Sequence, residues 1–425
     1  MTTSIEGYKL GKFIYEGKTK KVYDLPEHPG LCLLLSKDRI TAGDGVQAHN
    51  LQGKSEIVNT TNALVFQILN EAGLDTAYVK PAGPNAFIAK KCEMVPIEWV
   101  IRRLATGSFL TRNPGVPEGY RFSPPKQETF FKDDANHDPI WSYEQVIFAK
   151  FTCNGVLIGP DEFNIMERMA LAVFEVLEKA WATKNCALID MKIEFGVDKQ
   201  GNIVLADIID SDSWRLWPAG DKRLMVDKEV YRNLESFTES DLDTVMRNYI
   251  WVNNQLKDMI PKNDHLVVIL MGSASDKAHC EKIADQCKSL GLNTELCVSS
   301  AHKAPEESLR IMREYESVMN NLIFICVAGR SNGLGPVLSG NTTYPVINCP
   351  PLKAENMQVD VWSSLNVPSG LGCPTVLYSE TAALHAAQIL GLSNYMIWSK
   401  LRVKQLNNFI NLKKADKELR GVRKA

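Results

Sequence analysis

The sequence of 425 residues predicts two folded units of different fold class, an α+β unit over residues 1–260 and an α/β unit over residues 266–425. Two observations lead to this prediction. In the first segment, short strand-like runs come before the helical periodicity, an order that is typical of α+β folds. In the second segment, continuous apolar strands alternate with helical stretches, which predicts a doubly wound parallel sheet that binds ligands at the carboxyl ends of its strands. Residues 261–265, which begin with a proline and have no apolar period, are expected to form the linker.

The expected elements follow this division. In the first unit we expect strands at 13–15, 21–23, 32–35 and 87–89, followed by helices at 165–182 and 241–259. In the second unit we expect strands at 266–271, 294–298 and 322–327, which alternate with helices at 276–290 and 305–315. The segment from Asn394 to the end is basic and amphipathic, so we expect a helix that packs on its own domain or on a neighbouring subunit.

Charge and cysteine content exclude several classes of function. The chain has 48 lysine and arginine residues against 50 aspartate and glutamate residues, so no global field draws it to nucleic acid or to a membrane, and we expect neither as a partner. No apolar run approaches the about 20 residues that span a bilayer. The ten cysteines are scattered without a C-x-x-C pair, and no charged-then-apolar leader opens the sequence, so we expect reduced thiols and a cytosolic protein.

A glycine and three lysines lie between the first two expected strands, in the segment 14–23. A tight glycine turn lets backbone N–H groups approach phosphate oxygens, and Lys18 or Lys20 would add positive charge there. A basic hairpin at the surface is the alternative interpretation. The segment alone does not decide between them.

The segment 188–196 alternates apolar and charged residues with period two, so Asp190, Lys192 and Glu194 share one face of a strand. Three ionisable groups on one face need partners or a ligand. A hairpin that turns at 199–202 would bring Glu194 close to Asp207, and Mg²⁺ prefers one or two carboxylates together with phosphate oxygens. A solvated acidic hairpin is the alternative.

Paired arginines follow an apolar strand in the segment 93–108. Guanidinium groups suit carboxylate and phosphate ligands, so Arg102, Arg103 and Ser108 form a candidate site for an anionic substrate.

These segments resemble the SAICAR synthetase family, ATP-dependent ligases that join aspartate to a carboxyaminoimidazole ribonucleotide in de novo purine synthesis. The resemblance extends from about residue 8 to 260 and appears in four motifs in chain order, at 16–20, 96–108, 190–196 and 212–217. It implies ATP and Mg²⁺ as cofactors. It also implies roles for individual residues: Lys18 and Lys20 on ATP phosphates, Met94 at the adenine, Glu194 and Asp207 on Mg²⁺, Arg102, Ser108, Asp212 and Arg215 on the substrates, and Asp190 and Lys192 in catalysis.

In the second unit, the first two strands end in small polar loops. The loop at 271–276 contains a glycine, two serines and an aspartate before a helix, where free N–H groups and the helix dipole favour an anion or a ribose. A plain helix cap by Ser275 or Asp276 is the alternative. His302 follows the second strand, where α/β folds place ligands, and histidine titrates near neutrality. A structural histidine remains the other interpretation.

The third strand is followed by Gly-Arg-Ser-Asn-Gly at 329–333, which satisfies the nucleophile-elbow pattern of serine hydrolases. Asp360 and His385 come later in the hydrolase order. A hydrolase leaves the first two loops unexplained, so it is kept as an alternative.

From about residue 265 to 425 the chain instead resembles the phosphoribosylaminoimidazole carboxylase family in its animal type. The bacterial mutases of that family carry Gly-Gly-Ala-Ala-His where this chain has Gly-Arg-Ser-Asn-Gly. The resemblance implies direct use of CO₂ without ATP, biotin or a metal. It implies that the ribonucleotide is bound by Ser273, Ser275, Asp276, Ser300 and Lys303. It implies that CO₂ or the new carboxylate contacts Arg330, Ser331 and Asn332, and that His302 transfers the proton.

Together the two resemblances imply a bifunctional enzyme of the animal type that acts on aminoimidazole ribonucleotides, CO₂, L-aspartate and ATP. That family forms homo-octamers through the carboxylase domain. A small-molecule kinase fused to a serine hydrolase or to a ribonucleotide-binding module is the alternative, because Asp190-x-Lys192 and Asp207 also mimic a kinase catalytic loop and metal aspartate.

Overall fold

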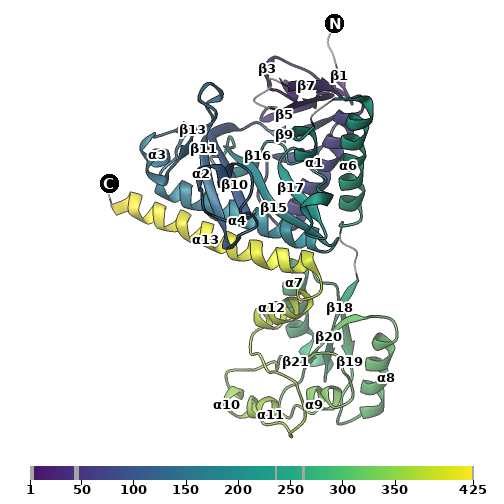
Figure 1. The fold of residues 1–425 in the computed structure, drawn as a ribbon. Coiled ribbons are helices and arrows are strands. Elements are labelled where there is room, and N and C mark those ends of the chain that lie inside the picture. The colour runs from purple at the N-terminus through teal and green to yellow at the C-terminus, as the bar shows by residue number, and fades with distance from the viewer. Residues whose placement is uncertain (1–3, 43–46, 235–236, 261–263, 424–425) are drawn as a thin grey trace. The chain divides into compact units, whose positions relative to one another are not determined.

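The computed structural model describes residues 4–42, 47–234, 237–260 and 264–423. Its contacts divide the chain into two units (Figure 1), Met1–Ile260 with Arg402–Ala425 and Pro261–Leu401. Most of the expected linker, residues 261–263, lies outside the described residues. The last residues differ from the expected division, because the contacts assign 402–425 to the first unit and not to the second.

The first unit begins with a five-stranded antiparallel sheet in the order β3-β4-β5-β9-β8. Its strands are β3 (Phe13–Glu16), β4 (Lys20–Asp24), β5 (Leu31–Ser36), β8 (Tyr78–Pro81) and β9 (Ala86–Lys90). Helix α1 (Lys54–Glu71) packs on β5, β8 and β9, and α6 (Glu239–Lys257) packs on α1. The four expected strands are confirmed.

The second sheet of this unit has the order β12-β11-β10-β15-β16, and β17 also pairs with β15. Its strands are β10 (Glu93–Leu104), β11 (Arg121–Phe131), β12 (Ile140–Trp141), β15 (Cys186–Val197), β16 (Ile203–Ala206) and β17 (Trp214–Pro218). Helix α4 (Pro160–Ala182) covers it and buries apolar side chains such as Phe174. The helix starts before the expected residue 165, because its first turn is polar and is recognisable only by the N-terminal proline and the Glu162 cap.

Shorter elements complete the unit. They are β1 (Ser4–Ile5), β2 (Tyr8–Lys9), β6 (Arg39–Ala42), β7 (Gln47–Asn50), α2 (Ser108–Arg112), α3 (Tyr143–Phe148), β13 (Thr152–Cys153), β14 (Val156–Leu157) and α5 (Glu229–Arg232).

The second unit contains a four-stranded parallel sheet in the order β19-β18-β20-β21, formed by β18 (His265–Met271), β19 (Thr294–Val298), β20 (Asn321–Val327) and β21 (Val346–Asn348). Alternate residues of β18 enter two different cores, Val267 and Ile269 in one and Val268 and Leu270 in the other. Helices α7 (Lys277–Ser289) and α12 (Ser379–Leu390) contribute to the first core, and α8 (Pro305–Glu316) and α9 (Leu334–Ser339) to the second. The predicted doubly wound sheet is confirmed.

The chain order reverses at β18, since it leaves to β19 on one side and returns to β20 on the other. Open α/β sheets bind ligands at such a reversal, beyond the carboxyl ends of the strands. The loops after β18, β19 and β20 therefore lie where a ligand site is expected.

The expected C-terminal helix is confirmed as α13 (Tyr395–Arg423). From Arg402 onward it runs along α4 of the first unit (Figure 1), so the expectation that it packs on its own domain or on a neighbouring subunit is not met. Its Val403 and Leu406 are buried. Arg402 bonds to Glu175 at 2.6 Å and Lys413 to Asp161 at 2.9 Å, both on α4. None of the helices in the described ranges is long and apolar enough to cross a bilayer.

Candidate active sites

A cavity of about 740 Å³ lies in the first unit, and both of its sheets line it. Its lining includes all eleven residues to which the ligase resemblance assigns a role: Lys18, Lys20, Met94, Arg102, Ser108, Asp190, Lys192, Glu194, Asp207, Asp212 and Arg215. The fold thus brings together segments that are almost 200 positions apart in the sequence.

The two lysines of the glycine turn differ in environment. The Lys18 side chain is about half exposed, and its Nζ donates to Asp134 at 3.1 Å. Lys20 is the more buried of the two and contacts Asp207 at the end of β16. Burial lowers the pKa of Lys20 to about 8, although the nearby Glu194 charge acts in the opposite direction. Lys20 is therefore a cation that can lose its proton near physiological pH.

Lys192 and Glu194 lie on β15, side by side on the face that lines the cavity. The β10–β15 register sets Glu194 directly opposite Glu98, and like charges in that position repel. Lys192 Nζ lies between them and donates to both at 2.8 Å, while Lys132 donates to Glu194 at 2.8 Å. Burial alone would raise the pKa of Glu194, but Lys192 and Lys132 lower it to about 2. Glu194 is therefore ionised at neutral pH.

The expected hairpin is present, and it sets Glu194 opposite Ala206, the residue before Asp207. Asp207 has a φ of 62°, a conformation that turns the chain directly after β16. In the described ranges no cluster of three or more His, Cys, Asp or Glu side chains could hold a metal. Glu194 and Asp207 nonetheless both line the cavity, and one or two carboxylates are the protein ligands that Mg²⁺ usually takes, so the residues present fit that ion.

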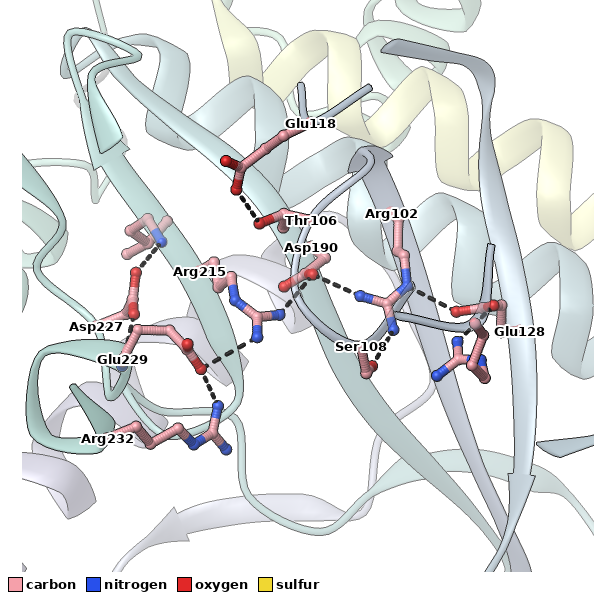
Figure 2. A network of polar contacts seen from close by, with 12 residues as sticks. Arg102, Thr106, Ser108, Glu118, Glu128, Asp190, Arg215, Asp227, Glu229 and Arg232 are labelled. Atoms are coloured by element: carbon pink, nitrogen blue, oxygen red, sulfur yellow. Dashed lines mark hydrogen bonds and ion pairs between the residues drawn. The ribbon is translucent and has the colours of Figure 1, made fainter. Parts of the chain in front are cut away.

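Arg102, Asp190 and Arg215 form a row across β10, β15 and β17, because the register sets Asp190 directly opposite both arginines. Asp190 Oδ2 accepts from Arg102 Nη1 at 2.8 Å and from Arg215 Nη1 at 2.7 Å (Figure 2). Arg102 Nη2 also donates to Ser108 Oγ at 3.4 Å. Arg102 and Arg112 also share Glu128, and Arg215 and Arg232 share Glu229, so four guanidinium groups face three carboxylates and net positive charge remains for an anionic ligand.

Arg103 lies on the other face of β10, since neighbouring strand residues point in opposite directions. Its Nε and Nη2 donate to Glu178 of α4 at 2.6 and 2.7 Å, and it does not line the cavity. The prediction that Arg103 shares the anion site is therefore wrong.

Asp212 is held by three partners that the sequence analysis missed. It accepts a hydrogen bond from Tyr249 and ion-pairs with Lys54 and Lys228, at N···O distances of 3.2 and 3.5 Å. Burial would raise the pKa of Asp212, but Lys54 and Lys228 hold it well below its usual range. Burial and the Asp212 charge raise the pKa of neighbouring Asp210 to about 6. Asp212 is thus kept ionised, and its negative charge makes the neighbouring Asp210 easier to protonate.

Some of the missed residues carried a local signal. Glu98, Val100 and Arg102 are alternate residues of β10, and alternate residues of a strand point to the same face. A prediction that Arg102 faces the cavity therefore also places Glu98 there, as the structure shows. Lys54 and Tyr249 had no such signal, because each lies on a helix whose facing partner is set only by tertiary packing.

In the second unit, Ser273, Ser275 and Asp276 lie in the loop after β18. Ser275 Oγ donates to Ser273 Oγ at 2.9 Å, and Ser273 Oγ accepts from the Ser275 N–H at 3.3 Å. Neither Ser275 nor Asp276 caps a helix with its side chain. Both serines remain exposed.

The loops after β19 and β20 meet at His302 and Gly333. A Cβ atom on Gly333 would lie 2.8 Å from His302 Nε2, so only glycine leaves room for the imidazole. His302, Lys303, Arg330 and Ser331 are exposed, and Ser300 is half-buried. Three loops with these polar groups thus lie at the carboxyl end of the sheet, as predicted.

Asn332 differs from its neighbours because it is buried. Its Nδ2 donates to Ser364 Oγ at 3.1 Å, and its Oδ1 accepts from the Gly335 N–H at 3.2 Å. These two bonds hold the loop and use one N–H and one lone pair of the amide. The contact of Asn332 with CO₂ or the new carboxylate stays a prediction.

The hydrolase alternative finds no support in this unit. Among the described residues, Ser331 has no hydrogen bond to Asp360 or to His385, so the pattern at 329–333 does not form a triad.

Comparison with known proteins agrees with both resemblances. The family model for SAICAR synthetase matches residues 13–249, and that for AIR carboxylase matches residues 266–409. The chain is 78% identical over 424 residues to a bifunctional phosphoribosylaminoimidazole carboxylase/phosphoribosylaminoimidazole succinocarboxamide synthetase of Drosophila melanogaster, covering 100% of this chain and 99% of the relative. The chain belongs to this bifunctional carboxylase–synthetase family.

Other members of the bifunctional family support the assignment. The human relative is 56% identical over 98% of this chain and 98% of its own length. A solved SAICAR synthetase in complex with ADP is 34% identical, with a TM-score of 0.51, and aligns with 58% of this chain and 99% of that chain.

Proposed function

We propose that this chain catalyses two successive steps of de novo purine synthesis. The second unit carboxylates 5-aminoimidazole ribonucleotide, and the first unit ligates the product to L-aspartate with ATP, giving SAICAR, ADP and phosphate. The observation that carries the proposal is the cavity of about 740 Å³ in the first unit, which is lined by all eleven residues to which the ligase resemblance assigns a role.

The ligase chemistry follows from the nature of the leaving group. The carboxylate of the ribonucleotide cannot be displaced directly, because oxide is a poor leaving group at neutral pH. The carboxylate oxygen attacks the γ-phosphate and ADP leaves. The amine of aspartate then attacks the acyl phosphate, loses a proton and expels phosphate. The protein positions the reactants and neutralises charge, with Lys18, Lys20 and Lys192 at the phosphates and with Arg102, Ser108, Asp212 and Arg215 at the two anionic substrates.

Glu194 and Asp207 are the residues that would hold Mg²⁺, because both line the cavity and each pairs with one of the lysines assigned to the phosphates. The ion would supply charge neutralisation to the phosphate oxygens. Met94, at the start of β10, is assigned to the adenine.

The carboxylation needs no cofactor, because the aminoimidazole ring is an enamine whose ring carbon can attack CO₂ directly. A C–C bond forms, and the proton on that carbon must leave. We assign the ribonucleotide to Ser273, Ser275, Asp276, Ser300 and Lys303, CO₂ and the new carboxylate to Arg330, Ser331 and Asn332, and the proton transfer to His302.

Self-association through the second unit is part of the proposal, with a homo-octamer as the expected state. Support comes from the exposed apolar side chains of two short helices that contact each other, α10 (Met357–Asp360) and α11 (Trp362–Leu365): Met357, Val359, Trp362 and Leu365 are 47 to 76% exposed. Exposed apolar side chains that lie close together are typical of an interface. We also propose a cytosolic location, which agrees with thiols that are mostly buried in the two units.

A coupled assay tests the whole proposal. Purified protein with 5-aminoimidazole ribonucleotide, bicarbonate as the source of CO₂, L-aspartate, ATP and Mg²⁺ is expected to form SAICAR, detected by mass spectrometry, and to form none when aspartate is omitted. A phosphorylated product without aspartate would favour a kinase. Labelling of Ser331 by a fluorophosphonate would favour a hydrolase.

A further inference from the structure

Glu128 is a buried carboxylate beside the ligase cavity that is not among the cavity's lining residues. It lies on β11, and its side chain is 4% exposed. Its Oε2 accepts from Arg102 Nε at 2.7 Å (Figure 2). Its Oε1 accepts from Arg112 Nη2 at 2.7 Å. Glu128 therefore touches the anion site only through other side chains.

The contacts of Arg102 determine which part of its guanidinium group remains for a ligand. Glu128 binds Nε and Asp190 binds Nη1, so two carboxylates hold the planar group at two of its nitrogens. The third nitrogen, Nη2, points towards Ser108. Because a guanidinium group is rigid and planar, these two bonds fix the direction of the third nitrogen. Without Glu128, Asp190 alone would hold Arg102, and Asp190 is shared with Arg215.

The second contact of Glu128 acts on the same end of the cavity. Arg112 closes the short helix α2, whose first residue is Ser108. Its guanidinium group also lies over the Phe130 ring, 5.1 Å from the centroid. One carboxylate thus restrains both Arg102 and the helix that presents the Ser108 hydroxyl.

We propose that Glu128 is a positioning residue of the ligase reaction, which aims Arg102 and Ser108 at the anionic group of the ribonucleotide. This inference rests on the proposed ligase function and deepens it. Glu128 acts on binding of the ribonucleotide and not on the phosphate chemistry, because Lys20 and Glu194 lie on other strands and have no contact with it in the described part of the chain.

The neighbouring residue on β10 offers a matched control. Arg103 is paired with Glu178 through two hydrogen bonds at 2.6 and 2.7 Å, on the face away from the cavity. Replacing Glu178 removes a comparable arginine–glutamate pair from the same strand without touching the anion site. Comparing the two glutamate variants therefore distinguishes the loss of a buried ion pair in general from the loss of Arg102 positioning.

The experiment compares Glu128→Gln with Glu178→Gln in steady-state ligation by the full chain. For Glu128→Gln, the KM for the carboxylated ribonucleotide is expected to rise about tenfold, since a hydrogen bond to a charged group is lost. Its kcat and its KM for ATP are expected to stay within about twofold. Glu178→Gln is expected to leave all three constants near their wild-type values. An equal change of the ribonucleotide KM in both variants, or none in Glu128→Gln, would overturn the inference.

A double-mutant cycle tests whether Glu128 acts through Arg102. In an Arg102→Lys background, Glu128→Gln is expected to cause less than about twofold further change in the ribonucleotide KM, because the group it aims is gone. A full, additive effect there contradicts the inference. If Glu128→Gln does not fold, Glu128→Asp, which keeps the charge but retracts it, is expected to raise the same KM about threefold. Failure of the wild-type chain to ligate at all would instead refute the proposed function.

Discussion

At the scale of single residues, the chemistry of the ligase site depends on how buried charges are paired. Lys20, Glu194, Asp210 and Asp212 all lie in one cavity, yet their pKa values move in different directions because their partners differ. Burial disfavours each charged form, and only a close opposite charge reverses that effect.

The lowered pKa of Lys20 predicts a pH dependence for ATP. Burial lowers this pKa to about 8, so the cation that is needed at the phosphates is present below pH 8 and is lost as the pH rises through that value. The kcat/KM for ATP is therefore expected to fall about tenfold per pH unit above about pH 8. Lys20→Arg is expected to remove this fall, because arginine does not titrate in that range. An unchanged slope in Lys20→Arg would assign the titration to another group.

The two metal-site carboxylates give a second prediction. Glu194→Ala or Asp207→Ala is expected to lower ligation by at least about a hundredfold, because each variant removes an oxygen ligand and leaves lysine charge uncompensated. Carboxylation by the other unit is expected to persist. Each half-reaction is assayed separately by product chromatography. Equal loss of both activities would show that the residues act on the whole chain and not on a metal in one unit.

At the scale of elements, the contact between the loops of His302 and Gly333 predicts a loss of carboxylation with ligation retained, the reverse of the metal-site variants. Gly333→Ala would place a methyl group 2.8 Å from His302 Nε2 and displace the imidazole, although the backbone φ of −83° at Gly333 accepts alanine without strain. Carboxylation is expected to fall about tenfold or more, with ligation unchanged. His302→Asn is expected to show the same split. Unchanged carboxylation in both variants would remove His302 from the mechanism.

The C-terminal helix predicts that the ligase unit depends on residues at the other end of the chain. A chain that ends at Leu401 loses the buried side chains of Val403 and Leu406 and several ion pairs to α4. The first unit is expected to lose about 4 kcal/mol of unfolding free energy in urea, mostly from the two apolar side chains, because exposed ion pairs contribute about 1 kcal/mol or less.

A shorter truncation is the control. A chain that ends at Leu412 keeps Val403 and Leu406 but loses Lys413, Lys417 and Arg420, and it is expected to lose only about 1 kcal/mol. Equal destabilisation in the two truncations would show that the ion pairs and not the apolar contacts hold the helix.

At the scale of the whole molecule, the apolar surface of α10 (Met357–Asp360) and α11 (Trp362–Leu365) predicts self-association. Trp362 is 64% exposed, and Trp362→Glu would place a charge inside any interface formed there. Light scattering after size-exclusion chromatography is expected to show a smaller assembly, with ligation retained. An unchanged molar mass would place the interface elsewhere.

Local patterns in the sequence were sufficient to predict the two fold classes, the strands that were expected in each unit, and the fact that Lys192 and Glu194 lie on the same face of a strand. This is because strand periodicity and turn chemistry act over a few residues, and because four ligase motifs and three carboxylase loops lie on short continuous segments. Such signals predict that certain groups face the same way. They do not show what lies opposite.

Only the tertiary structure decided which of two adjacent arginines enters the cavity, which helix residues hold Asp212, and to which unit the end of α13 belongs. Arg102 and Arg103 look alike in sequence, and the pairing of β10 with β11 and β15 sets Arg102 between Glu128 and Asp190 while Arg103 meets Glu178. The partners of the buried Asn332 amide, Ser364 and Gly335, were likewise not visible in the sequence. Long-range packing selects the partners, and the partners determine charge, orientation and access.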